Sequence, residues 1–218
     1  MTHRFQPLYD LRITTPRLEL RVPDPETLEG LAEVAAAGVH RDDEMPFSVP
    51  WSAAPPLERG RATVRHVLGT LAQWRSEDWT LALAVLHEGR PVGRMDLTGR
   101  DFAVTREAST GSWLGLAHQG AGLGTEMRAA VLHLAFGELG ALAVTSSAMT
   151  DNPRSLGVSR RLGYREDGEE SAAVSGRRRT LRRLRLDRAT WTARAADAPA
   201  GGGVRIEGLE GCREMFGV

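Results

Sequence analysis

Cysteine is almost absent from this sequence of 218 residues, in which Cys212 is the only one. A single thiol cannot form a disulfide within the chain, and it does not supply the cysteine ligands of a structural metal site. The sequence also lacks an N-terminal apolar stretch of signal-peptide length and any run of the roughly 18 apolar residues that a membrane-spanning helix needs. These absences predict a protein of a reducing compartment, the cytoplasm, with no metal ion.

Net charge is missing as well, because Lys and Arg together number 28 and Asp and Glu together also number 28. A chain without net charge has no overall electrostatic attraction to nucleic acid or to an anionic membrane, so we expect neither as a partner. Two arginine clusters, 177–179 and 182–183, are interpreted as the solvated face of alternating strands. The hydrophobic share of 41% is enough to bury one core.

Apolar periodicity predicts an α/β fold. The predicted order is a strand, two helices, three strands, a helix, a strand, a helix and two closing strands. One strand–helix–strand unit over 107–149 predicts a parallel, right-handed crossover, and a short turn at 88–89 suits an antiparallel hairpin. The predicted strands are 17–22, 79–87, 90–97, 107–116, 142–149, 164–174 and 180–186. The first predicted helix starts at Pro25, and the other three cover 57–77, 125–139 and 151–162.

The C-terminal part of the chain is predicted to lie apart from the main domain. Residues 1–190 form the predicted domain, 191–203 a linker that contains the sequence AADAPAGGG, and 204–218 a C-terminal extension. In this extension Leu209, Cys212, Met215 and Phe216 could form the apolar side of a short helix. That side would pack on its own domain or on a second subunit, and the second arrangement would give a homo-oligomer.

The most informative stretch is WLGLAHQGAGLGTEMR at 113–128, where three glycines separate a predicted strand from a predicted helix. Glycines at a helix N-terminus let a ligand approach the backbone N–H groups, and the helix dipole favours an anion there. A P-loop is excluded, because Gly124 is followed by Thr125 and Glu126 in place of Lys and Ser or Thr. A dinucleotide fingerprint fits poorly, since its third glycine lies one position early. A plain tight turn is the remaining alternative.

Gln119, Gly122 and Gly124 match the pattern Q/R-x-x-G-x-G/A, and with the blocks around them they give a family resemblance. The sequence resembles the GNAT superfamily of acyl-CoA-dependent N-acyltransferases over roughly residues 15–188. It is most similar to the ribosomal-protein N-acetyltransferase-like branch, and its layout also resembles actinobacterial proteins described as succinyl-CoA transferases. The other matching blocks are TPRLELR at 15–21, GSWL at 111–114, DNPRS at 151–155 and RLGY at 161–164.

The resemblance implies a mixed, mostly antiparallel sheet with a splayed parallel strand pair, flanked by helices. It also implies that acyl-CoA, carrying an acetyl or a succinyl group, binds as co-substrate. Its diphosphate would lie on the backbone of the glycine loop, and its pantetheine arm along the strand that ends at 113–116. The implied binding residues are Trp113, Leu114, Leu116, Gln119, Gly120, Ala121, Gly122, Gly124, Thr125, Asn152 and Ser155.

The same resemblance implies direct attack of a neutral amine on the thioester. Asn152 matches the position that hydrogen-bonds pantetheine, and Ser155 the serine that stabilises or protonates the departing thiolate; helix capping is the alternative role for both. The general base stays open, because Ser109 stands where relatives often have glutamate and the second usual position falls near Val174. Other acids that could take the role are Asp96, Glu107, Glu169 and Glu170, and an ordered water is a further alternative.

The acceptor is predicted to be an amine-bearing small molecule or a protein N-terminus or lysine. The irregular segment 40–56 would bind it, with Met45, Phe47 and Trp51 as an apolar wall and the acids of 42–44 attracting its charge. A succinyl group would need a cation, for which Arg94, Arg100 and Arg106 are candidates. The alternative function is a non-catalytic acyl-CoA-binding sensor that regulates a partner.

Overall fold

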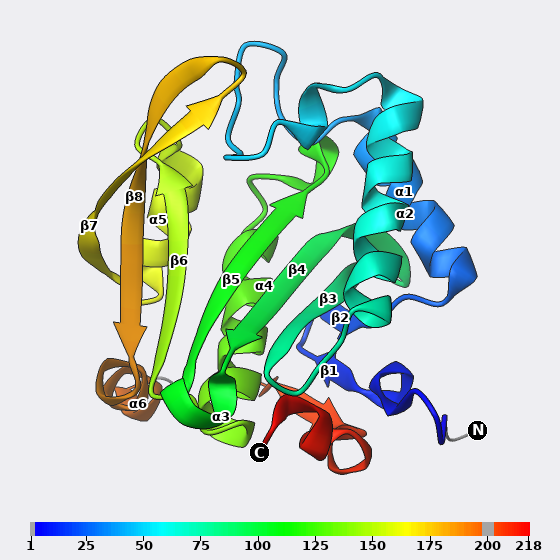
Figure 1. Cartoon of the computed structure of the whole chain (residues 1–218), viewed down its shortest axis with the longest axis vertical. Coiled ribbons are helices and arrows are strands. Elements are labelled where there is room, and N and C mark those ends of the chain that lie inside the picture. Colours follow the sequence, from blue (N-terminus) through cyan, green and yellow to red (C-terminus); the bar gives the residue numbers. More distant parts are fainter. Residues whose placement is uncertain (1–2, 198–202) are drawn as a thin grey trace.

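The computed structural model describes residues 3–197 and 203–218, which build one sheet of nine strands (Figure 1). The strand order is β7-β8-β6-β5-β4-β3-β2-β1-β9, and every neighbouring pair is antiparallel except β5 and β6. The strands are β1 (Arg12–Thr14), β2 (Leu18–Arg21), β3 (Asp78–His87), β4 (Arg90–Arg100), β5 (Glu107–Leu114), β6 (Ala143–Met149), β7 (Arg165–Val174), β8 (Arg177–Asp187) and β9 (Arg205–Glu207).

The helices follow the predicted order, with two additions. The α-helices are α1 (Pro25–Ala37), α2 (Pro56–Ala72), α3 (Phe102–Thr105), α4 (Leu123–Leu132), α5 (Pro153–Arg161) and α6 (Arg188–Asp197), of which α3 and α6 were not predicted. Helix α4 continues into a π-helical turn, η4 (His133–Glu138). Short 3-10 turns in the described part of the chain include η1 (Pro7–Asp10), η2 (Trp51–Ala53), η3 (Leu116–His118), η6 (Leu209–Gly211) and η7 (Arg213–Phe216). Helices in the described ranges are all too short or too polar to cross a bilayer.

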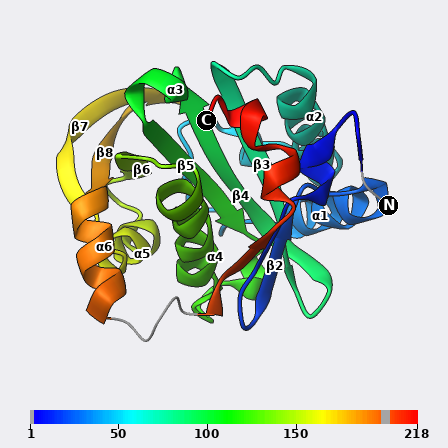
Figure 2. The ribbon, with the colours of Figure 1, turned by 90° about the horizontal axis from the view of Figure 1, so that it is seen from below.

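Helices cover both faces of the sheet, as the side chains of β3 show. Leu81, Leu83 and Val85 belong to a core cluster shared with α4, while Ala82 and Ala84 belong to a second cluster shared with α1 and α2. Successive side chains of a strand point to opposite faces, so a strand covered on both sides is apolar throughout. Figure 2 shows α4, α5 and α6 on one side of the sheet and α1 and α2 on the other.

Strands β5 and β6 separate along their length. They pair in parallel from Glu107 with Ala143 to Thr110 with Ser146, and no pair follows. From Gly111 onwards β5 stays paired with β4 alone, whereas β6 stays paired with β8 as far as Met149. The parallel crossover and the splayed strand pair are therefore confirmed, and the splay opens at Gly111 toward the glycine loop.

The C-terminal residues differ from the prediction. Of the linker predicted over 191–203, residues 191–197 are helical in α6, and residues 198–202 lie outside the described residues. The extension 204–218 is one strand and two 3-10 turns instead of one short helix, and β9 pairs with β1. Leu209, Cys212 and Phe216 are buried in the same core cluster as Trp79 and α4, so this apolar side packs on its own domain.

Candidate active site

The glycine loop ends in a helix start with free backbone donors. Gly120 and Gly122 adopt positive φ angles of 84° and 81°, and Gly122 is the N-cap of α4. Within the described ranges, the backbone N–H groups from Gly120 to Gly124 donate no hydrogen bond to the protein. Several unpaired N–H groups at the positive end of a helix dipole form a cradle that fits a diphosphate. The loop therefore combines a tight turn with free backbone donors.

The N-terminal block TPRLELR braces this loop through Glu126. Thr15 Oγ donates to Glu126 Oε1 at 2.6 Å, and Arg17 Nε donates to Glu126 Oε2 at 2.6 Å. A second Arg17 nitrogen donates to the carbonyl of Ala121 at 3.0 Å. Burial alone would raise the pKa of Glu126, but the bonds from Thr15 and Arg17 outweigh it and leave that pKa lowered. The first turn of α4 is therefore fixed to the start of β2.

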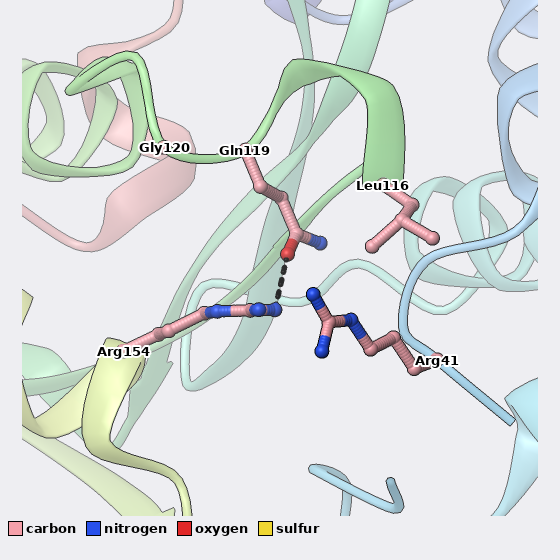
Figure 3. A pocket seen from close by; sticks show the side chains of 5 residues that line it. All are labelled: Arg41, Leu116, Gln119, Gly120 and Arg154. Carbon is pink, nitrogen blue, oxygen red and sulfur yellow. Dashed lines mark hydrogen bonds between the residues drawn. The ribbon is translucent and has the colours of Figure 1, made fainter. Parts of the chain in front are cut away.

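Gln119 acts as a brace through its side chain. Its amide nitrogen donates to the carbonyls of Val39 at 2.8 Å and Leu114 at 3.0 Å, and its amide oxygen accepts from Arg154 at 3.0 Å. The guanidinium groups of Arg41 and Arg154 both point toward it (Figure 3). A small cavity of about 330 Å³ is lined by Arg41, Leu116, Gln119, Gly120 and Arg154.

A larger groove of about 1420 Å³ runs through the splay between β5 and β6. It brings together most of the predicted site residues. Leu116 lines only the smaller cavity, and Ala121 lines neither cavity. The predicted residues that line the groove are Met45, Phe47, Trp51, Trp113, Leu114, Gln119, Gly120, Gly122, Gly124, Thr125, Asn152 and Ser155.

The segment between α1 and α2 forms the wall of the groove on the α2 side. The rings of Phe47 and Trp51 lie 5.3 Å apart, and the rings of Trp51 and Trp113 lie 5.7 Å apart. Met45 packs against a small cluster that includes Val174 and Leu181, so the segment reaches across to the β7–β8 hairpin (Figure 1). The groove is therefore bounded on this side by aromatic rings and covered by a loop.

Asn152 and Ser155 lie on the opposite, α5 side of the groove. Asn152 is the N-cap of α5, and its side-chain oxygen accepts from the Ser155 N–H at 3.0 Å. The Ser155 hydroxyl makes no hydrogen bond within the described ranges, and it is half-buried in the groove lining. Capping thus uses the amide of Asn152 and leaves the Ser155 hydroxyl available to a ligand.

Sequence reasoning missed Arg128, a buried cation in the groove lining. This α4 residue is 5% exposed, and it donates to Ser159 Oγ at 2.9 Å and to Ser112 Oγ at 3.3 Å. Its Nε has no partner in the described ranges, and burial lowers the pKa of its guanidinium. A buried charge normally has a counter-charge, and hydroxyls do not supply one. The signal in the sequence that could have found Arg128 is its position directly after Met127, which lies on the apolar stripe of the predicted helix 125–139.

A second polar cluster lies on the α2 side of the groove. Asp96 of β4 is 8% exposed, and its carboxylate pairs with Arg94 Nε at 2.9 Å and with His66 Nε2 at 3.1 Å. Burial alone would raise the pKa of Asp96, but the charge of Arg94 and the bond from His66 outweigh it and leave that pKa lowered. Asp96 is one of the acids that the sequence offers as a general base, and His66 is not among the residues predicted for the site.

The other candidates considered for the base or for the acyl cation lie elsewhere. Glu107 pairs with Arg185 at 2.7 Å, and Glu169 pairs with Arg182 at 2.9 Å. Arg100 pairs with Asp78, and Arg106 donates to the carbonyl of Leu139 at 3.3 Å. None of these, nor Glu170, lines the groove. No group of three or more potential metal-ligating side chains occurs among the described residues.

Comparison with known proteins shows the family of the chain and relatives of its fold. Residues 17–165 match the family model described as acetyltransferase (GNAT) domain, and the chain belongs to this family. Many solved structures share the fold, and three of them show its range. RimJ from Mycobacterium smegmatis, in complex with CoA-disulfide, is 16% identical with a TM-score of 0.67, and the match covers 91% of this chain and 98% of that one.

The second structure is RimL, a ribosomal L7/L12 alpha-N-protein acetyltransferase in complex with coenzyme A; it is 17% identical with a TM-score of 0.63, and the match covers 79% of this chain and 95% of that one. The third is a chimera of the spermidine N-acetyltransferase SpeG from Vibrio cholerae and hSSAT. It is 16% identical with a TM-score of 0.61, and the match covers 81% of this chain and 98% of that one.

Proposed function

We propose that the protein transfers an acyl group from acyl-CoA to a primary amine by direct attack, in the cytoplasm. The observation that carries this proposal is the cradle of free N–H groups at Gly120–Gly124, which opens into the splay between β5 and β6. The cradle fits the diphosphate of coenzyme A, and Arg41 and Arg154 beside it add positive charge. The edge of β5 that β6 leaves free from Gly111 onwards fits the amides of the pantetheine arm.

The reaction needs no covalent intermediate on the protein. The amine nitrogen attacks the thioester carbonyl, a C–N bond forms, the C–S bond breaks, and coenzyme A leaves as a thiolate. A backbone N–H near Leu114 would polarise the carbonyl. Asn152 would orient the pantetheine, and the Ser155 hydroxyl, which has no partner in the described ranges, would stabilise or protonate the thiolate.

Replacing Ser155 by alanine is expected to lower kcat about tenfold to a hundredfold, because a hydrogen bond to a charged group contributes about 1.5–3 kcal/mol. The affinity for acyl-CoA should change little, since the hydroxyl acts on the departing sulfur. Steady-state release of free thiol from acyl-CoA measures both parameters. A Ser155→Thr variant keeps the hydroxyl and should retain most of the activity; equal losses in the two variants would contradict the role of the hydroxyl.

The acyl group is acetyl or succinyl in this proposal. Acetyl is the ordinary substrate of an acetyltransferase family, and nothing in the groove opposes it. The buried charge of Arg128 favours a donor with a terminal carboxylate, because this charge has no counter-ion in the described ranges. Arg94, which also lines the groove, is already neutralised by Asp96.

Replacing Arg128 by methionine is expected to lower kcat/KM for succinyl-CoA about tenfold to a hundredfold, because the variant loses one charge-assisted hydrogen bond to the succinyl carboxylate. Turnover of acetyl-CoA should stay within about threefold. The variant should fold, because an apolar side chain of similar length in place of an unpaired buried charge is often neutral or stabilising. Competition between the two donors, read by product mass, gives the ratio directly. Equal losses for both donors would show that Arg128 is structural.

The acceptor in this proposal is an amine of a small molecule or of a protein N-terminus or lysine. Asp42, Asp43 and Glu44 line the groove beside the aromatic wall and would attract a cationic amine. Two of the similar structures act on a ribosomal-protein α-amino group and on spermidine according to their names. A polyamine and a peptide with a free N-terminus are therefore the first acceptors to test.

The test is intact-mass analysis of these acceptors after incubation with acetyl-CoA or succinyl-CoA. The expected result is a mass gain of one acyl group together with release of free coenzyme A. The chain contains no lysine, so acylation of the protein itself is confined to its N-terminal amine and is easily separated from transfer. Tight binding of acyl-CoA without transfer to any amine would favour the non-catalytic sensor instead.

A further inference from the structure

His66, Asp96 and Arg94 form a connected cluster on the side of the sheet that α1 and α2 cover. His66 lies on α2 and is 37% exposed at its side chain, and its Nε2 is 3.1 Å from Asp96 Oδ2. Arg94 binds both oxygens of Asp96, with Nε at 2.9 Å from Oδ1 and a terminal nitrogen at 3.0 Å from Oδ2. All three side chains line the groove. The imidazole therefore has one edge fixed and another accessible.

The hydrogen bond fixes which nitrogen of His66 carries the proton. Arg94 keeps Asp96 ionised, and an ionised carboxylate only accepts hydrogen bonds. His66 Nε2 must then donate its N–H to Asp96, which leaves Nδ1 of the neutral ring with a lone pair. Within the described ranges, Nδ1 has no hydrogen-bond partner of its own. A histidine held in this way by a buried carboxylate is prepared to take a proton from a ligand.

The cluster lies beside the splay, where the proposed acyl transfer would take place. Asp96 is paired across β4 and β5 with Gly111, the first residue of β5 beyond its pairing with β6. Arg94 is paired with Trp113, and its guanidinium lies over the Trp113 ring at 6.0 Å. The Trp113 ring also contacts the ring of Trp51, which belongs to the aromatic wall of the groove. The cluster thus faces the amine-binding side of the splay, across the sheet from α4 and α5.

We propose that His66 is the general base of the acyl transfer and that Asp96 is its positioning residue. His66 Nδ1 takes one proton from the ammonium of the acceptor, and the neutral nitrogen then attacks the thioester carbonyl. The second proton of that nitrogen ends on the sulfur of coenzyme A after the C–S bond breaks. The proton on His66 passes to solvent through the exposed edge of the ring. This inference rests on the proposed function.

The charges around His66 support proton removal. From β4, Asp96 stabilises the imidazolium that forms, while Arg94 faces Asp96 and is neutralised by it. The segment between α1 and α2 adds Asp42, Asp43, Glu44 and His40 to the same groove. Among the described residues of α1, β3 and α2 itself, no charged side chain is within hydrogen-bond distance of the ring.

The test compares His66→Gln with the wild-type chain for one primary amine. Glutamine can keep the donor to Asp96 but offers no basic nitrogen, so kcat/KM should fall about a hundredfold to a thousandfold. The affinity for acyl-CoA and the melting temperature should stay close to those of the wild type. In a His66→Ala variant, added imidazole should restore part of the rate. Any rise of kcat/KM with pH that the wild type shows should be missing from both variants.

Asp96→Asn tests the positioning role. Loss of the carboxylate removes a counter-ion of the imidazolium, so the rise of kcat/KM should move to lower pH, and the maximal rate should fall. A purely structural contact would lower stability without moving the pH profile. A His66→Gln variant with wild-type rate and pH profile overturns the assignment of the base and leaves the proposed function standing. Absence of transfer by the wild-type chain to every amine overturns both.

Discussion

Replacing Gly122 by aspartate is expected to weaken the binding of coenzyme A by about two orders of magnitude. A carboxylate about 5 Å from the diphosphate costs about 3 kcal/mol at an effective dielectric constant of 20, and each 1.4 kcal/mol is a factor of ten in affinity. The fold should persist, because aspartate tolerates a positive φ and is a preferred N-cap. Arg17, the nearest side chain, is already paired with Glu126. Calorimetric titration with coenzyme A measures the change.

Gly122→Asn is the matched control for this prediction. Asparagine has the shape of aspartate and the same tolerance of a positive φ, but it carries no charge. It should lose less than about tenfold in affinity, through closer packing alone. If the two variants bind coenzyme A equally well, the diphosphate does not lie on this helix start, and the proposed site loses its main support.

Replacing Phe216 by alanine is expected to destabilise the whole domain by about 3–5 kcal/mol. Phe216 is 0% exposed, and its ring meets those of Trp79 at 5.0 Å and Trp74 at 5.3 Å. The Trp74 ring also donates its N–H to the carbonyl of Met215 at 2.9 Å. The extension 204–218 therefore fills the core on the α4 side of the sheet, and the cavity left by alanine should lower the free energy of unfolding. Urea unfolding measures this change.

Phe5→Ala deletes the same ring at a surface position and serves as the control. Phe5 is 92% exposed, and surface substitutions of this kind change stability by about 0.5 kcal/mol or less. A Phe216→Ala variant as stable as Phe5→Ala would show that the extension is dispensable for the domain. A large effect at Phe216 alone would show that residues 204–218 belong to the same cooperative unit.

The glycine loop shows why part of the site could be predicted from the sequence. A loop between a strand and a helix is a local structure, and the residues that shape it are consecutive in the chain. Gly120 and Gly122 both adopt the left-handed conformation that glycine adopts without steric cost. The order of the longer central strands and helices was predictable for the same reason, since apolar periodicity is a property of neighbouring residues, whereas β1, α3, α6 and β9 were not predicted.

The side chains proposed for proton transfer and acyl binding were harder to predict, because they meet from distant parts of the chain. His66 and Asp96 are 30 residues apart, and the bond between them depends on how α2 packs on β4. Arg128 meets Ser112 and Ser159 only after α4 has packed between β5 and α5. No periodicity or motif in a single sequence carries these distances.

The structure of the C-terminal residues could not be predicted from local sequence patterns. Glycine and alanine at 195–203 are typical of a linker, yet 195–197 continue the helix α6. Helix formation there depends on what the preceding turn packs against, which composition does not reveal. The pairing of β9 with β1 joins strands at opposite ends of the chain, and such a contact is invisible to local patterns.

The sequence by itself determined most of the order of the elements, the glycine-rich helix start and the resemblance to GNAT proteins, because each of these depends on residues that are adjacent or at fixed spacing. Only the tertiary structure decided which charges face the groove, which are neutralised and which side of the sheet they occupy. The physical reason is that a side chain's charge and proton affinity depend on its burial and on its partners in space, and these exist only after the chain has folded.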